Sequence, residues 1–319
     1  MGMLVKGVWR DLGYDTKAGE FLRNESVFRE RVTADGSSGF RAEPGRYHLY
    51  VSLACPWAHR SLILRTLKGL EKPISVSIVD PYMGPDGWAF SDRPGCTRNA
   101  INGATLLREV YLKARPDYTG RVTVPMLWDL KTGTIVNNES AEIIRMLNRE
   151  FDAFVSRHLP DLYPDSLRPE IDRWNALIYP AVNNGVYRAG FATTQEKYET
   201  AVHDLFETLN MIEEHLGRHR YLCGNQLTEA DWRLFTTLVR FDAVYYGHFK
   251  CNLRRLSDFQ NLWDYARELY QIPGIAATVD MWHIKEHYYR SHARINPTGI
   301  VPVGPKVDFA APHGREALG

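Results

Sequence analysis

The cysteine at position 55 is the residue of this sequence whose setting could best support chemistry, because Pro56 follows it directly. Residues 47–52 alternate with the period of a strand, whereas apolar residues from position 62 to 70 recur at helical spacing. Proline suits the first position of a helix, where its missing N–H is not needed. We therefore expect Cys55 at or near a helix N-cap, where unpaired N–H groups and the helix dipole would favour the thiolate and lower the thiol pKa.

The other three cysteines, Cys96, Cys223 and Cys251, lie far apart, and none forms a Cys-x-x-Cys pair. We expect neither a disulfide framework nor a zinc site from such spacing in a reducing compartment. A cysteine is more often a small buried hydrophobe than a nucleophile, and we assign that role to these three. Ala58 stands where a second thiol could have resolved a disulfide at Cys55, so an outside thiol would be needed.

The composition limits the classes of protein to which this chain can belong. Its 319 residues exceed what a single core usually spans, so we expect two domains. With 39 basic and 38 acidic residues the net charge is near zero, which argues against nucleic acid or an anionic membrane as a partner. The first residues lack the apolar core of a signal peptide, and no stretch has the roughly 20 apolar residues of a membrane span. The sequence thus predicts a cytoplasmic protein.

Between residues 47 and 155 the pattern predicts the element order βαβαββα. Residues 74–80 alternate in a second strand, which we expect to pair in parallel with the first. There follow a long loop over 81–102, a helix near 104–114, a strand over 121–129, a hairpin into a fourth strand, and a helix opening at Asn138. Pro125, inside the third strand, requires an edge, a bulge or a cis bond. This order, with a cysteine after the first strand, is typical of a thioredoxin-like fold.

Beyond Phe154 strand signals disappear and helical periodicity dominates, with residues 161–169 as the linker. Apolar residues recur every three or four positions from Tyr198 to Leu216, as on the buried face of a long helix. Thr228 and Asp231 have the spacing of a capping box. Further helices are expected over 232–246, 258–270, 273–280 and 282–290. The second domain is therefore expected to be all-helical.

The predicted fold class is α/β plus all-α, in four segments. Residues 1–46 form an irregular extension, with a short strand or hairpin between Phe28 and Phe40. Residues 47–155 form the thioredoxin-like domain, and residues 166–290 form the all-helical domain. Residues 291–319 form a tail rich in proline and glycine.

His283 and His287 have the i, i+4 spacing at which two side chains of one helix face could bind a metal ion. A protein zinc site needs at least a third ligand, and the sequence offers none nearby. We therefore predict a solvated helix face here and no metal site.

A thioredoxin-like domain followed by an all-helical domain resembles the soluble glutathione transferases, over roughly residues 45–290. Glu139-Ser140 looks like the pair that holds the γ-glutamyl end of glutathione in that family, and Val124-Pro125 looks like its residue before a cis-proline. The corner Cys55-Pro56-Trp57-Ala58 and the segments 88–90 and 121–125 resemble the Xi class, the glutathionyl-hydroquinone reductases. The extension, residues 221–252 and the tail are similar to theirs as well.

This resemblance implies that Cys55 attacks the sulfur of a glutathionyl-hydroquinone and carries glutathione as a mixed disulfide, which a second glutathione resolves. It implies a general acid for the carbon that loses sulfur, a role that we assign to Tyr187, with Tyr288 near the same pocket and Tyr245 as a further candidate. Tyrosine hydroxyls of this kind would also stabilise the thiolate. Glutathione, the co-substrate, would be held by Trp88, Arg121, Val122, Thr123, Val124, Glu139 and Ser140. The resemblance also implies a homodimer.

Other interpretations stay open at this point. A monothiol corner also serves an omega-like thiol transferase or dehydroascorbate reductase. A non-catalytic binding module could use the same fold without needing the thiol. Glu139 and Ser140 could simply cap a helix, and each of the three tyrosines could be a core or interface aromatic.

Overall fold

The chain divides into two compact units in the computed structural model. The first comprises Met1–Asp15, Arg23–Pro160 and Thr278–His292, and the second comprises Thr16–Leu22, Asp161–Ala277 and Ala293–Gly319. The structure describes residues 2–13 and 16–318, so positions 1, 14, 15 and 319 of the expected extension and tail lie outside the described residues. Within the described part, no helix has the length and apolar character needed to cross a membrane.

A four-stranded mixed sheet forms the centre of the first unit. Its order is β10 (Thr134–Asn137), β9 (Met126–Asp129), β7 (Tyr47–Val51), β8 (Ile74–Ile78). The predicted parallel pairing of β7 with β8 is confirmed, and β9 runs antiparallel to β7. All five residues of β7 are buried rather than alternately exposed, because helices cover both faces of the sheet.

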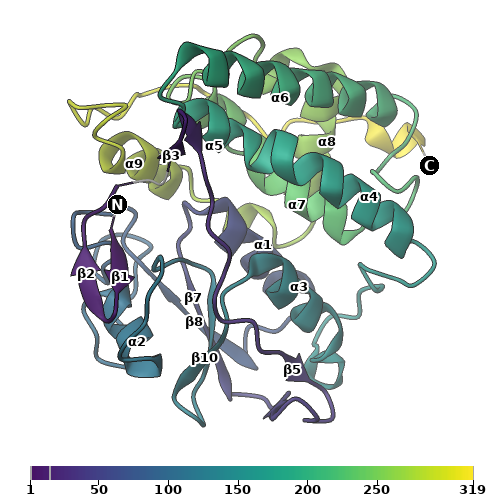
Figure 1. Cartoon of the computed structure of the whole chain (residues 1–319). Coiled ribbons are helices and arrows are strands. Elements are labelled where there is room, and N and C mark those ends of the chain that lie inside the picture. Colours follow the sequence, from purple (N-terminus) through teal and green to yellow (C-terminus); the bar gives the residue numbers. More distant parts are fainter. Residues whose placement is uncertain (1, 14–15, 319) are drawn as a thin grey trace. The chain divides into compact units, whose positions relative to one another are not determined.

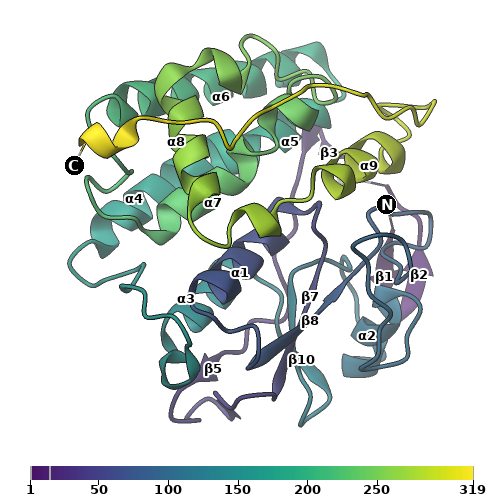
Figure 2. The same ribbon diagram turned by 180° about the vertical axis from the view of Figure 1, so that it is seen from behind.

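The helices of the first unit lie on opposite sides of this sheet. Helices α1 (Pro56–Leu67) and α3 (Ser140–Arg149) pack side by side on one face, and α2 (Leu107–Ala114) lies on the other (Figure 1). The reverse view shows the same arrangement (Figure 2). The predicted order βαβαββα and the thioredoxin-like fold class are therefore confirmed.

The third strand is shorter than predicted. The expected strand over 121–129 begins only at Met126, because Pro125 has no N–H to donate to the ladder. The Val124-Pro125 peptide is cis, one of the options that a proline in this place required. The four residues before Pro125 therefore lie outside the strand.

The extension contains paired strands. β1 (Met3–Val5) and β2 (Val8–Arg10) form a hairpin, and β3 (Thr16–Lys17) pairs antiparallel with β4 (Glu20–Phe21) in the second unit. Of the short strand or hairpin expected between Phe28 and Phe40, the short strand is confirmed as β5 (Val32–Thr33), but it does not form a hairpin, since it pairs parallel with β6 (Phe40–Arg41). Two successive turns, closed by Gly36 and Gly39, reverse the chain twice between these strands.

The second unit is built from helices, as predicted. They are α4 (Arg168–Ile178), α5 (Gly185–Gly190), α6 (Gln195–Leu216), α7 (Glu229–Leu238) and α8 (Gln260–Gln271), with π-helical turns at Tyr179–Asn183 and Phe241–Tyr245. The long amphipathic helix and the capping box are confirmed. Thr228 N–H donates to the Asp231 carboxylate at 2.8 Å. The helix expected over 232–246 ends at Leu238 and gives way to the second π turn.

One further expectation for the C-terminal third needs correction. No α-helix forms over 273–280, where only the turn Ala276–Thr278 is helical, because Pro273 opens the segment and Gly274 has φ +91°. The tail packs against the second unit, where the Phe309 ring lies 4.8 Å from that of Trp263.

Helix α9 (Met281–Ser291) belongs with the first unit, although the pattern had grouped it with the helical domain. Its partner is the long loop that follows β8. Met83 N–H in that loop donates to the Ser291 hydroxyl at 2.9 Å. The domain limits expected from the sequence therefore differ from the observed units in this helix and in residues 16–22, which join the second unit.

Candidate active site around Cys55

Cys55 is the N-cap of α1, as predicted, with extended backbone angles (φ −77°, ψ 121°) and Pro56 as the first helical residue. The side chain is partly exposed and makes no capping bond to α1. Its S–H instead donates to the carbonyl oxygen of Val124 across 3.4 Å. The sulfur therefore lies between the N-terminus of a helix and the residue before the cis-proline, two features that the sequence had linked only by resemblance.

Hydrogen bonds of Tyr111, a residue of α2, fix the backbone segment that lies beside Cys55. Tyr111, which is fully buried, donates its hydroxyl to the carbonyl oxygen of Thr123 at 2.8 Å. Asn138 in turn donates to the Tyr111 hydroxyl at 3.2 Å. Val122 and Val124 are both buried. The segment that would pair with glutathione thus has its geometry set by hydrogen bonds to the rest of the first unit.

Glu139 and Ser140 open helix α3. Glu139 is the N-cap, and its carboxylate accepts from the Ala141 N–H at 3.1 Å and from the Ser26 hydroxyl at 3.1 Å. The Ser140 hydroxyl accepts from Arg60 at 3.3 Å. The capping interpretation is therefore observed for Glu139. The N-terminus of α3 is a place that favours anions, whereas the partly exposed carboxylate of Glu139 is itself a group that pairs with cations.

Sequence reasoning missed Ser26 and Arg60, the partners of this pair. Ser26 lies in an irregular segment with no local pattern to single it out. Arg60 is 1% exposed, and a fully buried arginine requires a partner. Its position one turn after Pro56, on the predicted apolar face of α1, was the available signal.

Trp88 and Arg121 lie at opposite ends of the stretch between β8 and β9. The Trp88 ring is buried and stacks on the His287 ring, with centroids 4.9 Å apart and planes inclined by 22°. The Arg121 guanidinium donates to the carbonyl oxygen of Gly2 at 3.3 Å. Both side chains thus belong to the first unit, together with Cys55.

The three candidate tyrosines divide between the units. Tyr288 is buried on α9 in the first unit, with its ring 5.3 Å from that of His287. Tyr187 and Tyr245 lie in the second unit with ring centroids 6.0 Å apart, and both contact the ring of Phe249. The structure thus brings Tyr187 and Tyr245 together in an aromatic cluster.

The other cysteines differ from Cys55 in their surroundings. Burial raises the pKa of the Cys223 thiol to about 12, and burial also raises that of Cys251. Cys96 was expected to be a buried hydrophobe, and that was wrong, since it is partly exposed in the loop after β8. Its pKa is raised by partial burial. All four cysteines, each within the described residues, are free thiols.

His283 and His287 are not on a solvated face, so that prediction was wrong. They are 0% and 8% exposed, because α9 lays this face against the loop after β8. Among the residues that the structure describes, no three histidine, cysteine or acidic side chains gather as a possible metal site.

Comparison with known proteins places this geometry in a family. The family model described as the N-terminal domain of glutathione S-transferase matches residues 54–150, and the model of the C-terminal domain matches residues 195–268. Glutathionyl-hydroquinone reductase YqjG of Escherichia coli (strain K12) is 57% identical, with 99% of each chain covered. Glutathionyl-hydroquinone reductase PcpF of Sphingobium chlorophenolicum is also 57% identical, with 96% of each chain covered.

Solved structures agree with these relatives. The Xi-class glutathione transferase from Natrialba magadii superposes with a TM-score of 0.94 at 53% identity, covering 100% of this chain and 97% of that one. The glutathione-bound structure of YqjG superposes with a TM-score of 0.92 at 55% identity, covering 99% of each chain. The family resemblance and the two-domain fold class inferred from the motifs are confirmed. The chain therefore belongs to the glutathione transferases, and within them to the group of Xi-class enzymes that includes the glutathionyl-hydroquinone reductases.

Proposed function

We propose that this protein reduces glutathionyl-hydroquinones to hydroquinones, with glutathione as co-substrate and a Cys55–glutathione mixed disulfide as the intermediate. The observation that carries the proposal is a partly exposed thiol at the N-cap of α1, 3.4 Å from the carbonyl oxygen of Val124. The high identity to relatives named for this reaction, over nearly the whole chain, supports the choice of substrate class.

In the first step the Cys55 thiolate attacks the sulfur of the glutathionyl-hydroquinone. A sulfur–sulfur bond forms to Cys55 while the bond from sulfur to the ring carbon breaks. The ring carbon takes the electron pair of that bond and a proton, so the hydroquinone is reduced and the two sulfurs are oxidised to a disulfide. A tyrosine hydroxyl donates this proton, and Tyr288, Tyr187 and Tyr245 are the candidates.

In the second step a glutathione thiolate attacks the glutathione sulfur of the mixed disulfide. Oxidised glutathione leaves, and the Cys55 thiolate is regenerated at the helix N-terminus, which stabilises a leaving thiolate. Position 58, where a Cys-x-x-Cys motif would carry a resolving thiol, holds a buried alanine. The external co-substrate is therefore the natural resolving thiol.

The residues that we assign to glutathione have the chemistry to hold a tripeptide thiol. The N-terminus of α3, with Glu139 and Ser140, offers N–H groups to the γ-glutamyl carboxylate and a carboxylate to its ammonium group. The Val124 backbone is suited to pair with the cysteinyl part. Arg121 adds a positive charge, and Trp88 adds an apolar surface. Val122 and Thr123 form the backbone segment that leads to Val124.

A turnover assay tests the proposal. Purified protein mixed with glutathionyl-hydroquinone and glutathione should release free hydroquinone, measured by liquid chromatography. Cys55→Ser should abolish the release, and Cys96→Ser, the matched partly exposed thiol, should retain it. Reduction of a model disulfide without any release of hydroquinone would instead favour the omega-like thiol transferase. Full activity of Cys55→Ser in the first assay would exclude Cys55 as the nucleophile, and no turnover by the wild type in either assay would favour the binding module.

We also place the enzyme in the cytoplasm as a homodimer. Four free cysteines suit a reducing compartment. The dimer rests on the family resemblance, and light scattering coupled to size-exclusion chromatography measures the mass in solution. A mass equal to one chain would contradict it.

A further inference from the structure

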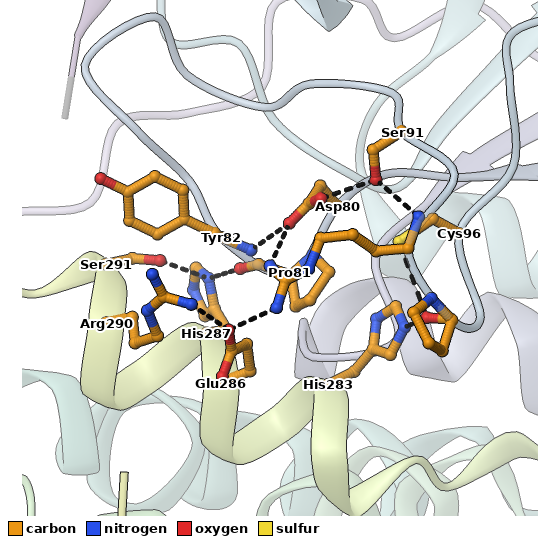
Figure 3. A network of polar contacts seen from close by, with 12 residues as sticks. Asp80, Pro81, Tyr82, Ser91, Cys96, His283, Glu286, His287, Arg290 and Ser291 are labelled. Atoms are coloured by element: carbon orange, nitrogen blue, oxygen red, sulfur yellow. Dashed lines mark hydrogen bonds and ion pairs between the residues drawn. The ribbon is translucent and has the colours of Figure 1, made fainter. Parts of the chain in front are cut away.

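Helix α9 is fastened to the loop after β8 by a polar network within the first unit (Figure 3). Arg93 of the loop forms ion pairs with Asp80, at 3.1 Å, and with Glu286 of the helix. Glu286 also pairs with Arg290 at 2.6 Å. The helix and the loop that carries Trp88 are therefore held as one element.

Two histidines on the same face of α9 reach this loop in similar ways. The ring of His283 donates from Nε2 to the carbonyl oxygen of Pro94 at 2.8 Å, and the ring of His287 donates from Nδ1 to that of Pro81 at 2.8 Å. A carbonyl oxygen can only accept, so these contacts fix which nitrogen of each ring carries a proton. In this respect the two side chains are equivalent anchors.

Only one of the two anchors touches groups of the proposed reaction. The His287 ring stacks on Trp88 at 4.9 Å and meets the Tyr288 ring edge to face at 5.3 Å. His283 contacts the ring of Trp282 instead, at 5.1 Å. Trp88 is the proposed glutathione contact, and Tyr288 is a candidate proton donor to the hydroquinone ring. His287 therefore connects the residue proposed for the glutathione half of the substrate with a residue proposed for the hydroquinone half.

We propose that His287 is a positioning residue, which holds the Trp88 ring for glutathione and keeps Tyr288 in a fixed relation to it. This inference rests on the proposed function. The hydrogen bond to Pro81 fixes the plane of the imidazole, and the stacked contact passes that orientation to the indole. Without the ring, the Trp88 side chain gains rotational freedom. Glutathione binding must then remove this freedom, so the affinity of the protein for glutathione falls.

The test compares His287→Gln with His283→Gln in the full-length protein. Each substitution removes an imidazole from the same face of α9 and leaves an uncharged amide in its place. S-Methylglutathione, a thioether that cannot form a disulfide, serves as the binding probe in calorimetry. We expect His287→Gln to raise its Kd by about threefold to tenfold, the scale of one stacked aromatic contact, and to slow hydroquinone release. His283→Gln should match the wild type in both.

Conservative variants separate positioning from folding. His287→Phe keeps a ring on Trp88 and should bring the Kd back toward the wild-type value, although it loses the bond to Pro81. If His287→Gln does not fold, as judged by circular dichroism, His287→Leu carries the same prediction. An unchanged Kd in the folded Gln or Leu variant, or an equal rise in His283→Gln, would overturn the inference.

The proposed function and this inference can fail separately. A wild-type protein that binds S-methylglutathione but releases no hydroquinone refutes the proposed reaction, and the Kd comparison still decides whether His287 supports the glutathione site. A wild-type protein that binds no S-methylglutathione refutes both.

Discussion

Selective alkylation of Cys55 follows from the surroundings of the four thiols. Iodoacetamide reacts with thiolates, so the rate at each cysteine depends on the thiolate fraction and on access. A thiol of ordinary pKa, about 8.5, is about 3% thiolate at pH 7. Burial raises the pKa of Cys223 to about 12, which leaves about one thiolate in a hundred thousand. The thiolate fraction of Cys55 should therefore exceed that of Cys223 about three thousandfold at pH 7, even if the N-terminus of α1 adds nothing, and Cys55 should react far faster.

The assay is a brief pulse of iodoacetamide on the folded protein, followed by peptide mapping in a mass spectrometer. Cys55 should be labelled first, Cys96 more slowly because its pKa is raised, and Cys223 and Cys251 only after denaturation. A series of pulses from pH 5 to 10 then gives the midpoint of the Cys55 rate, which the helix N-terminus should move below 8.5. A midpoint at or above that value, or faster labelling at Cys96, would refute the activation of Cys55.

Two substitutions test the glutathione site and the core beneath it. Glu139→Gln should raise the Kd of S-methylglutathione about tenfold, the scale of one charge-assisted hydrogen bond, while Glu142→Gln, on the same helix and paired with Arg29, should not; equal effects would contradict the assignment. Asp129→Asn should lower the free energy of unfolding by about 3 kcal/mol in urea, because it breaks a buried pair with Arg46 at 2.8 Å. The desolvation of buried Asp129 raises its pKa, but the hydrogen bonds from Arg46, Thr132 and the Lys131 N–H together with the charge of Arg46 outweigh it, so the pKa is lowered. This stabilisation should be complete above pH 4 and fade as the pH falls through the lowered pKa, and a pair that persists unchanged in acid would contradict it.

Much of the first unit could be predicted because its signals are local. Pro56 and the change of period marked the N-cap at Cys55, and the alternation in 74–78 marked β8. Pro125 indicated an unusual backbone geometry, but the sequence did not decide between an edge, a bulge and a cis bond. Each of these features depends on residues within a few positions, which is the range over which backbone preferences act.

The place of α9 could not be predicted from such signals. The pattern over 282–290 indicates a helix and its faces, but it does not say which part of the chain covers them. Histidines on a helix are polar enough to suggest solvent, but the loop carbonyls of Pro81 and Pro94 accept hydrogen bonds from His287 and His283 and so allow both rings to be buried. For the same reason, the spacing of neighbouring residues could not predict the contact between Trp88 and His287, which lie about 200 positions apart in the sequence.

A single-turnover experiment tests the central claim most directly. The protein, freed of glutathione, is mixed with an equimolar glutathionyl-hydroquinone, quenched in acid and digested without reductant. Hydroquinone release should equal the amount of glutathione found in disulfide linkage to the peptide that contains Cys55, and added glutathione should remove that label. Hydroquinone released with no glutathione on Cys55, or with the label on Cys96, would contradict the account.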